Sequence, residues 1–197
     1  MGYMKRFAED VSVAVGLDGE INDDVLAIAQ DMMDNGIIVR LAEDKDIEDV
    51  CRIVGQLSPE NPFQNLITHD CQGAHQKFNE NIQSSPDYFL WVAERNEDKK
   101  IVGTGMMHLQ HKLSYRCGTA AHLEDVVVDE DHRGQHIGET ILVVAVEAAK
   151  NLGCYKLMLT CYDKTASYYE QYGFARHDIG MRLSLKDEYE QATTTAD

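Results

Sequence analysis

Apolar and polar positions along this chain follow strand and helix periods in turn. The stretch IIVRLA, which starts at Ile37, has the apolar, β-branched texture of a strand. The stretch EDKDIEDVCRIVGQL follows, and its apolar residues Ile47, Val50, Val54 and Leu57 recur at helical spacing behind acidic residues that suit a helix N-terminus. After the break SPENPF, the stretch DCQGAHQKFNENIQ predicts a weaker helix.

Strand-like stretches dominate the rest of the chain. The stretch YFLWVAERNEDKKIVGTGMMHLQHKL predicts a hairpin of two strands around the polar turn RNEDKK, and AAHLEDVVV predicts a third strand. A polar turn with two glycines then leads into a long helix. The stretch CYKLMLTC predicts a strand, KTASYYEQYGF a short helix that ends at Gly173, and IGMRLSL a last strand. The order β-α-α-β-β-β-α-β-α-β predicts a mixed α/β sheet domain.

The length and the texture of the ends predict how the chain is divided. With 197 residues the chain is within the size range of one domain. Residues 1–35 are acidic and carry an apolar pattern only in DDVLAIAQDMM. We therefore expect an N-terminal arm with a short helix over residues 1–35, one α/β domain over residues 36–186 and a polar tail over residues 187–197.

Composition excludes several classes of protein. Hydrophobic residues make up 44% of the chain, and no apolar run approaches the ~18 residues that a membrane span needs. The start MGYMKRFAED lacks a signal core, and five widely spaced cysteines without a CxxC pair indicate reduced thiols. A net charge of -16 argues against a nucleic-acid partner. We therefore expect a soluble, cytoplasmic protein with neither a nucleic-acid nor a membrane partner.

The turn RGQHIG, between the EDVVV strand and the long helix, is the first candidate site. A helix N-terminus offers unpaired N–H groups and the positive end of the helix dipole, so a glycine-bearing turn before it suits phosphate. The turn lacks both the GxGxxG spacing and the lysine of GxxxxGK[ST], so neither a dinucleotide fold nor an NTPase is supported. Taken alone, the pattern also fits a simple turn.

Two longer motifs resemble the GNAT superfamily of acetyl-CoA-dependent N-acetyltransferases. The stretch HLEDVVVDEDHRGQHIG resembles its bulged strand and [QR]-x-x-G-x-[GA] loop, and YYEQYGF resembles its xxFYxKxGF helix. EDVVV, GCYKLMLTC and YYEQYGF together are similar to the glucosamine-6-phosphate N-acetyltransferase family. The resemblance covers roughly residues 37–185. It implies an α/β GNAT fold, with a mixed, mostly antiparallel sheet whose bulged central strand is flanked by helices.

The resemblance implies acetyl-CoA as co-substrate, held beside the bulged strand with its pyrophosphate on the turn. The implied cofactor-binding residues are Val126, Val127, Val128, Arg133, Gly134, Gln135, His136, Ile137, Gly138, Thr165 and Tyr169. His136 stands where the family usually has glycine, so its side chain must point away from the phosphates or interact with them. Thr165 stands where an asparagine often contacts the cofactor.

The resemblance also implies direct attack of a sugar 2-amine on the thioester. Tyr169 would protonate the leaving sulfur, although an aromatic residue on a short helix also fits the core. A backbone N–H near Val126 would stabilise the oxyanion. Thr160 replaces an acidic residue that is common in the family and cannot act as a base. Glu124 or a bound water would then supply that function, or the substrate would differ.

The implied sugar site draws on several segments. Its residues are Ser58, Lys112, Tyr115, Glu124, Asp125, Thr160 and Arg182. Adjacent strand residues face opposite sides, so Glu124 and Asp125 also fit a solvated edge, and Lys112 also fits an ordinary exposed lysine.

The stretch HLQH raises the question of a metal site. His108 and His111 would face opposite sides of a strand, so we expect no metal.

The last predicted strand bears on assembly. In the family this strand packs across a two-fold dimer, and an arginine near its end reaches the neighbour's sugar phosphate. That position is Ser184 here, with Arg182 two residues earlier and on the same face of a strand. We therefore expect a homodimer in which Arg182 completes the other subunit's site, with an ordinary exposed arginine as the alternative.

The expected function is transfer of acetyl from acetyl-CoA to glucosamine 6-phosphate, giving N-acetylglucosamine 6-phosphate for UDP-N-acetylglucosamine synthesis. Two alternatives stay open: a GNAT enzyme that acts on another amine, such as a peptide or a polyamine, and a catalytically silent acetyl-CoA-binding module.

Overall fold

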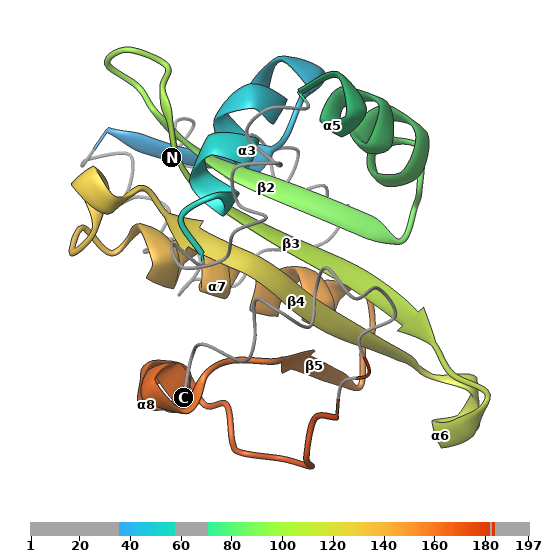
Figure 1. Cartoon of the computed structure of the whole chain (residues 1–197). Helices are drawn as coiled ribbons and strands as arrows, with labels where there is room; N and C mark the ends of the chain where they lie inside the picture. The colour runs from blue at the N-terminus through green and yellow to red at the C-terminus, as the bar shows by residue number, and fades with distance from the viewer. Residues whose placement is uncertain (1–35, 58–70, 182, 184–197) are drawn as a thin grey trace, which may run out of the picture.

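A mixed five-stranded sheet forms the centre of the protein, as the sequence predicts (Figure 1). The computed structural model describes residues 36–57, 71–181 and 183; the expected arm and tail lie outside them. The strands are β1 (Ile37–Leu41), β2 (Tyr88–Arg95), β3 (Ile101–His111), β4 (Thr119–Val128) and β5 (Lys156–Leu159), in spatial order β1-β2-β3-β4-β5. The first three pairings are antiparallel, whereas β4 and β5 run parallel.

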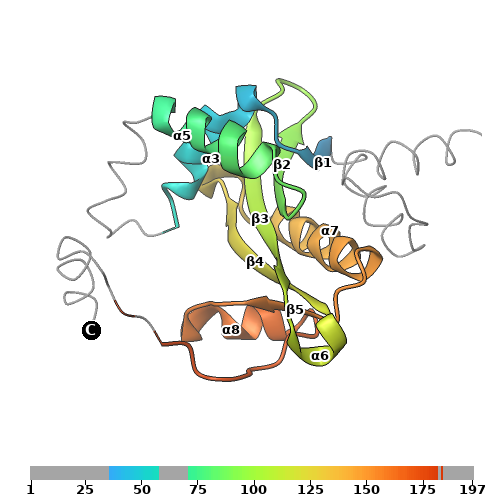
Figure 2. The same ribbon diagram turned by 90° about the vertical axis from the view of Figure 1, so that its right-hand side faces the viewer.

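Helices cover both faces of this sheet. They are η1 (Asp44–Asp46), α3 (Ile47–Val54), α5 (Cys71–Lys77), the π-helical η2 (Phe78–Gln83), α6 (Ser114–Cys117), η3 (Glu130–His132), α7 (Ile137–Asn151) and α8 (Asp163–Glu170). Figure 2 shows α3 and α5 on one side of the sheet and α7 on the other. Within the described ranges, no helix is long and apolar enough to cross a membrane.

Each face of the sheet packs into its own core. Met107 and Leu123 lie in the cluster that packs against α7, together with the fully buried Trp91. Met106 and Val92 belong to the cluster beneath α3. Because side chains alternate along a strand, the even-numbered positions of β3 around Met106 face away from α7.

Helix α7 approaches β3 closely at two glycines. A Cβ atom at Gly105 would lie 2.5 Å from Ile141 Cγ2, and one at Gly103 would lie 2.9 Å from Ile137 Cγ2. Such separations are shorter than carbon atoms tolerate, so these positions need glycine for packing. The start of α7 is thereby held against the middle of the sheet.

A β-bulge interrupts β4 beside these glycines. Thr104 pairs with Val127 and Met106 with Glu124, so the two residues 125 and 126 stand opposite Gly105 alone. Asp125 has a left-handed φ of 52°, which is one way in which the extra residue of a bulge is accommodated. The bulged central strand that the sequence predicts is therefore confirmed.

The end of the described chain differs from the sequence prediction. The predicted last strand spans residues 179–185, but residues 179–181 are not in a strand. Ile179, Met181 and Leu183 are 89%, 94% and 80% exposed. A strand needs a neighbour for its backbone groups, and the described part of this chain supplies none at that segment.

Candidate active site

The bulge marks the point where β4 leaves its neighbour β5. Parallel pairing joins Ala120–Leu123 to Lys156–Leu159, and β4 then continues to Val128 without pairing to β5. The backbone N–H and C=O groups of 124–128 that point away from β3 are thus on the side open to an extended ligand, as at a sheet edge. Val126 and Val128 pack against Ile137 and Ile141, so their side chains anchor the strand and leave ligand contacts to the backbone.

The segment that follows β4 is tied to α3 by the buried carboxylate of Asp129. This carboxylate is 2% exposed, forms an ion pair with Arg52 and accepts a hydrogen bond from the Asp131 N–H. Burial opposes its ionisation, but the hydrogen bonds from Arg52 and Asp131 outweigh burial and lower the pKa of Asp129. These contacts hold Asp129, the residue at which the turn begins, in place against α3.

The turn itself reaches the N-terminus of α7 through two left-handed residues. Gly134 has φ 76° and His136 has φ 59°, the conformation that glycine adopts most readily. The His136 Nδ1 atom lies 2.7 Å from Glu139 Oε2, and the side chain is 78% exposed. The imidazole is therefore held by the first turn of α7, and the backbone donors of the turn stay available.

The remaining turn residues frame this helix N-terminus. Arg133 donates from Nε to the Val128 carbonyl at 3.2 Å, and Gln135 is exposed.

Ile137 is buried at 2% exposure, and a Cβ at Gly138 would lie 3.1 Å from the Tyr168 hydroxyl oxygen. Helix α8 thus contacts the start of α7. Sequence reasoning treated Tyr168 only as a neighbour of Tyr169; the small residue at position 138 was the one signal of this contact.

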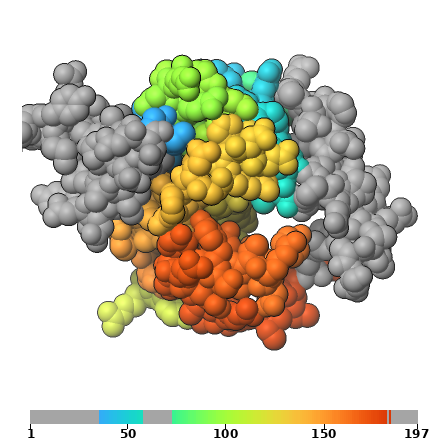
Figure 3. All heavy atoms as spheres, turned by 90° about the vertical axis from the view of Figure 1, so that its left-hand side faces the viewer, coloured from blue at the N-terminus to red at the C-terminus, as the bar shows by residue number. Residues whose placement is uncertain are grey.

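Tyr169 lies on α8, half-buried between two aromatic rings. Its ring meets Tyr168 edge-on at 5.2 Å and Phe174 at 6.1 Å between centroids. Burial, and to a smaller extent Cys161, raise the pKa of Tyr169, so the phenol keeps its proton at neutral pH. A protonated phenol suits a proton donor, and the same packing suits a core aromatic. Figure 3 shows the end of β4 and its turn (yellow) above α8 (orange to red), with an opening between them.

Thr165 and Thr160 occupy the two ends of the segment before Tyr169. The Thr165 hydroxyl donates to the Tyr162 carbonyl at 2.9 Å, in the first turn of α8. Thr160 follows directly after β5 and is exposed. Thr160 therefore lies where β4 and β5 separate, but it brings no carboxylate to that point.

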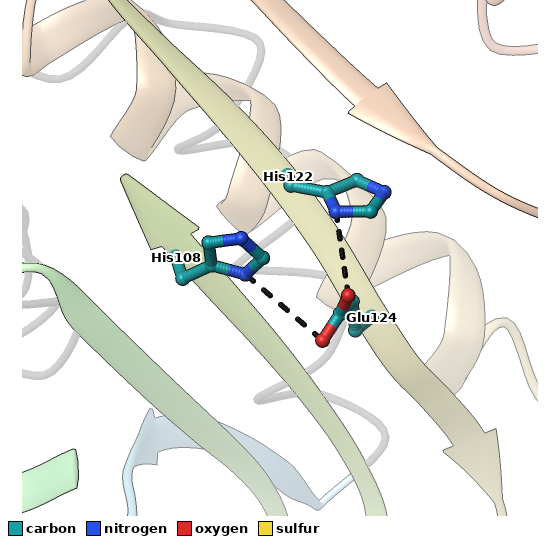
Figure 4. Close-up of side chains that lie close together, drawn as sticks. All are labelled: His108, His122 and Glu124. Carbon is teal, nitrogen blue, oxygen red and sulfur yellow. Dashed lines mark ion pairs between the residues drawn. The ribbon is translucent and has the colours of Figure 1, made fainter. Parts of the chain in front are cut away.

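A row of polar side chains runs along the sheet face that is turned away from α7. Figure 4 shows the Glu124 carboxylate between two imidazoles. Its oxygens lie 3.3 Å from His122 Nδ1 and 3.9 Å from His108 Nδ1. His108 Nε2 lies 3.3 Å from the Gln110 amide nitrogen, and Gln110 Oε1 accepts from Lys112 Nζ at 2.7 Å. We call Glu124, His122, His108, Gln110 and Lys112 the polar row.

The polar row has a carboxylate at one end and an ammonium at the other. The arrangement follows from two rules: residues two apart in a strand share a face, and His108 is paired directly with His122 across β3 and β4. Sequence reasoning found Glu124 and Lys112, but it weighed His108 only with His111 and did not consider His122, because a single strand does not reveal its register. The row can meet a ligand with a cation at one end and an anion at the other.

Other sugar-site candidates lie elsewhere. Tyr115 is 71% exposed at the tip of the β3–β4 hairpin, where it stacks on Tyr155. Thr119, which follows this tip and pairs with His111, lies about 17 Å along β4 from Glu124 by strand rise, so Tyr115 lies at the same end of the hairpin as Lys112. Burial, followed by the charge of Glu124, raises the pKa of Asp125. Ser58 and Arg182 lie outside the described residues.

Comparison with known proteins places these features in context. Residues 58–174 match the acetyltransferase (GNAT) family. The chain is 37% identical over 113 residues to a probable glucosamine 6-phosphate N-acetyltransferase of Drosophila melanogaster, which covers 57% of this chain and 51% of that protein. It is 32% identical to glucosamine 6-phosphate N-acetyltransferase 1 of rice (Oryza sativa subsp. japonica), over 66% of this chain and 76% of the relative.

A solved structure agrees with these relatives. The crystal structure of glucosamine-6-phosphate N-acetyltransferase from Arabidopsis thaliana superposes with a TM-score of 0.67 at 28% identity. The superposition covers 76% of this chain and 99% of that structure. The chain thus spans about half of the length of the fly relative but nearly all of the plant structure.

Proposed function

The chain belongs to the acetyltransferase (GNAT) family, and from this premise we propose that it transfers acetyl from acetyl-CoA to the 2-amine of glucosamine 6-phosphate. The observation that carries the proposal is the bulge in β4 at the point where pairing with β5 ends, immediately before a turn at a helix N-terminus. The names of the relatives support the choice of acceptor. The product, N-acetylglucosamine 6-phosphate, would supply UDP-N-acetylglucosamine synthesis.

Acetyl-CoA would lie along the unpaired part of β4. Backbone groups of Val126, Val127 and Val128 would bind the pantetheine, and N–H groups of the turn from Arg133 to Gly138 would hold the pyrophosphate at the positive end of α7. His136 is bonded to Glu139 in this arrangement, so its imidazole would not block the phosphates. The cofactor would thereby present its thioester beside the bulge.

The reaction would proceed by direct attack. The acceptor ammonium first loses one proton to a water molecule oriented by Glu124. The freed amine lone pair then forms a bond to the thioester carbon, and the Val126 N–H stabilises the oxyanion. The carbon–sulfur bond breaks, and the leaving thiolate takes its proton from the Tyr169 hydroxyl. The nitrogen loses its second proton to water, and water reprotonates the tyrosinate. Holding amine and thioester together removes the cost of a bimolecular encounter.

The polar row would bind the acceptor. Glu124 would orient the ammonium form of the amine before attack, and Lys112 would meet the sugar phosphate through charge-assisted hydrogen bonds. The Lys112 ammonium already points along the row, because it donates to Gln110 rather than into solvent. Thr160 would add a hydroxyl at the acceptor end, which leaves Glu124 as the one carboxylate of the row.

The active form would be a homodimer. Ile179, Met181 and Leu183 are exposed apolar residues at alternate positions, the pattern of one strand face. A second chain could cover them by strand pairing, which would satisfy the backbone and bury the apolar side chains. Arg182 would then reach the partner's sugar phosphate, where its planar guanidinium suits bidentate contact.

An acceptor screen tests the proposal. Purified protein, acetyl-CoA and one amine at a time are mixed, and free thiol is measured. Release with glucosamine 6-phosphate, well above that with peptides or polyamines, is the expected result. Preference for another amine would favour a different GNAT enzyme. Binding of acetyl-CoA without thiol release from any acceptor would favour a silent acetyl-CoA-binding module.

A further inference from the structure

Two imidazoles and one carboxylate converge on the sheet face opposite α7, and we propose that His108, His122 and Glu124 bind one divalent transition-metal ion of the zinc class. One ligand atom from each residue lies within 4.8 Å of the other two. The three residues come from neighbouring strands, so their backbones are fixed relative to one another. The site is distinct from the acetyl-CoA site, although it shares Glu124 with the proposed acceptor site.

Metal binding would draw together three ligand atoms that lie within 4.8 Å of one another. Zinc bonds of about 2.0–2.1 Å in a tetrahedron place neighbouring ligand atoms about 3.3 Å apart. The pair His122 Nδ1 and Glu124 Oε1 already stands at 3.3 Å, and His108 Nδ1 is 3.9 Å from Glu124 Oε2. Glu124 is 42% exposed, so its side chain has room to adjust and water can take the fourth position.

One ring nitrogen of this cluster stands without a hydrogen bond, and a histidine binds a metal through such a neutral ring nitrogen. His108 Nδ1 is buried and makes no hydrogen bond with any of the described residues. A buried ring nitrogen without a hydrogen-bond partner destabilises the folded state. A metal ion bound to His108 Nδ1 would remove this cost.

Neighbouring groups hold the His108 ring in position. Tyr88 stacks on it at 5.6 Å between centroids. The Gln110 amide lies 3.3 Å from Nε2, and an amide can present its oxygen as well as its nitrogen. With the oxygen turned from Lys112 towards Nε2–H, Gln110 would fix the tautomer that leaves the Nδ1 lone pair free for a metal, as outer-shell partners commonly do, and Lys112 would lose this acceptor.

Titration with Co²⁺ and Zn²⁺ tests the site on the full chain under reducing conditions, without acetyl-CoA or acceptor. Co²⁺ absorbance and competition with a chromogenic chelator give stoichiometry and affinity. We expect one equivalent to bind, and we expect His108→Phe and His122→Phe each to weaken binding about 10²-fold or more, since loss of even an outer-shell partner costs 10–100-fold. Unchanged thermal unfolding of the metal-free variants would show that they fold.

His111→Phe is the matched control. This variant changes the same residue type on the same strand. His111 Nε2 also lies near a carboxylate, 2.9 Å from Asp87 Oδ1, but His111 is not one of the three clustered ligands. Its metal affinity should equal that of the wild type. Absence of stoichiometric binding, affinity that survives in both cluster variants, or a thiolate-to-cobalt charge-transfer band from the exposed cysteines would overturn the proposal.

Enzymatic activity provides a second, separate readout. Because Glu124 would serve both the metal and the acceptor amine, Zn²⁺ should inhibit acetyl transfer in competition with the acceptor. This step rests on the proposed function, whereas metal titration does not, so failure of acetyl transfer would leave the binding result intact. Inhibition that is not competitive with the acceptor would contradict the shared use of Glu124.

Discussion

Tyr169 has the chemical properties that a thiolate leaving group requires from its proton donor. Burial keeps the phenol protonated, and α8 brings it near the start of α7 through Tyr168. Tyr169→Phe removes the proton donor and keeps the ring. We expect turnover to fall on the order of 10²-fold while the affinity for acetyl-CoA changes little.

Tyr168→Phe is the control for this change, because it removes a neighbouring hydroxyl of the same helix. Single-turnover measurements separate chemistry from product release. Full activity of Tyr169→Phe, with chemistry shown to limit the rate, would assign Tyr169 to the core.

Asp125 carries an electrostatic cost that depends on pH. Its pKa is raised by burial, so the ionised form destabilises the folded state at neutral pH, and the cost disappears as pH falls below the carboxyl's ordinary pKa. Asn tolerates the left-handed φ of 52° as well as Asp does. Asp125→Asn should therefore raise the melting temperature at pH 7, with a gain that shrinks towards pH 4.

Asp178→Asn is the matched control. Asp178 has the same residue type and a left-handed φ of 59°, but it is 80% exposed. A pH-independent gain at position 125, or an equal gain at position 178, would show that burial is not the cause. Activity should fall in Asp125→Asn if the carboxyl lines the sugar site.

At the scale of elements, the packing of α7 on β3 fixes the turn between β4 and α7. Gly105→Ala would place a methyl group 2.5 Å from Ile141 Cγ2 and should cost about 1–3 kcal/mol of unfolding free energy through overpacking. Urea denaturation measures this cost. Gly180→Ala meets nothing within 4 Å and should be nearly neutral. Equal stability of the two variants would contradict the close approach.

Much of this arrangement was predictable from the sequence, because its causes are local. Two strand-like stretches around the polar turn RNEDKK predicted β2 and β3, helical spacing predicted α3, and the strand-turn-helix pattern predicted β4 and α7. The register between β3 and β4 was not predictable, since it depends on which residues meet across strands. His108 and His122 therefore came together without a signal in either strand alone. The prediction of a strand from residue 179 is wrong for residues 179–181 for a related reason, because a strand needs a partner that pattern does not supply.

At the scale of the whole molecule, the exposed apolar residues Ile179, Met181 and Leu183 favour an assembly of two chains. Mixing an Arg182→Ala chain with a Tyr169→Phe chain tests whether the sites are shared. If Arg182 acts across the interface, mixed dimers regain one intact site and activity rises above that of either variant alone. No gain despite confirmed subunit exchange, or a monomer at working concentration, would contradict the proposal.

The central claim is that a phosphorylated amino sugar is the acceptor, and the most direct test is the ratio of kcat/KM for glucosamine 6-phosphate to that for glucosamine. Lys112 would meet the phosphate, so the account predicts a ratio of about 10²-fold or more in the wild type, given about 1.5–3 kcal/mol for each charged hydrogen bond. Lys112→Met should lower the ratio mainly through glucosamine 6-phosphate. Comparable kcat/KM values for the two sugars in the wild type would contradict the account.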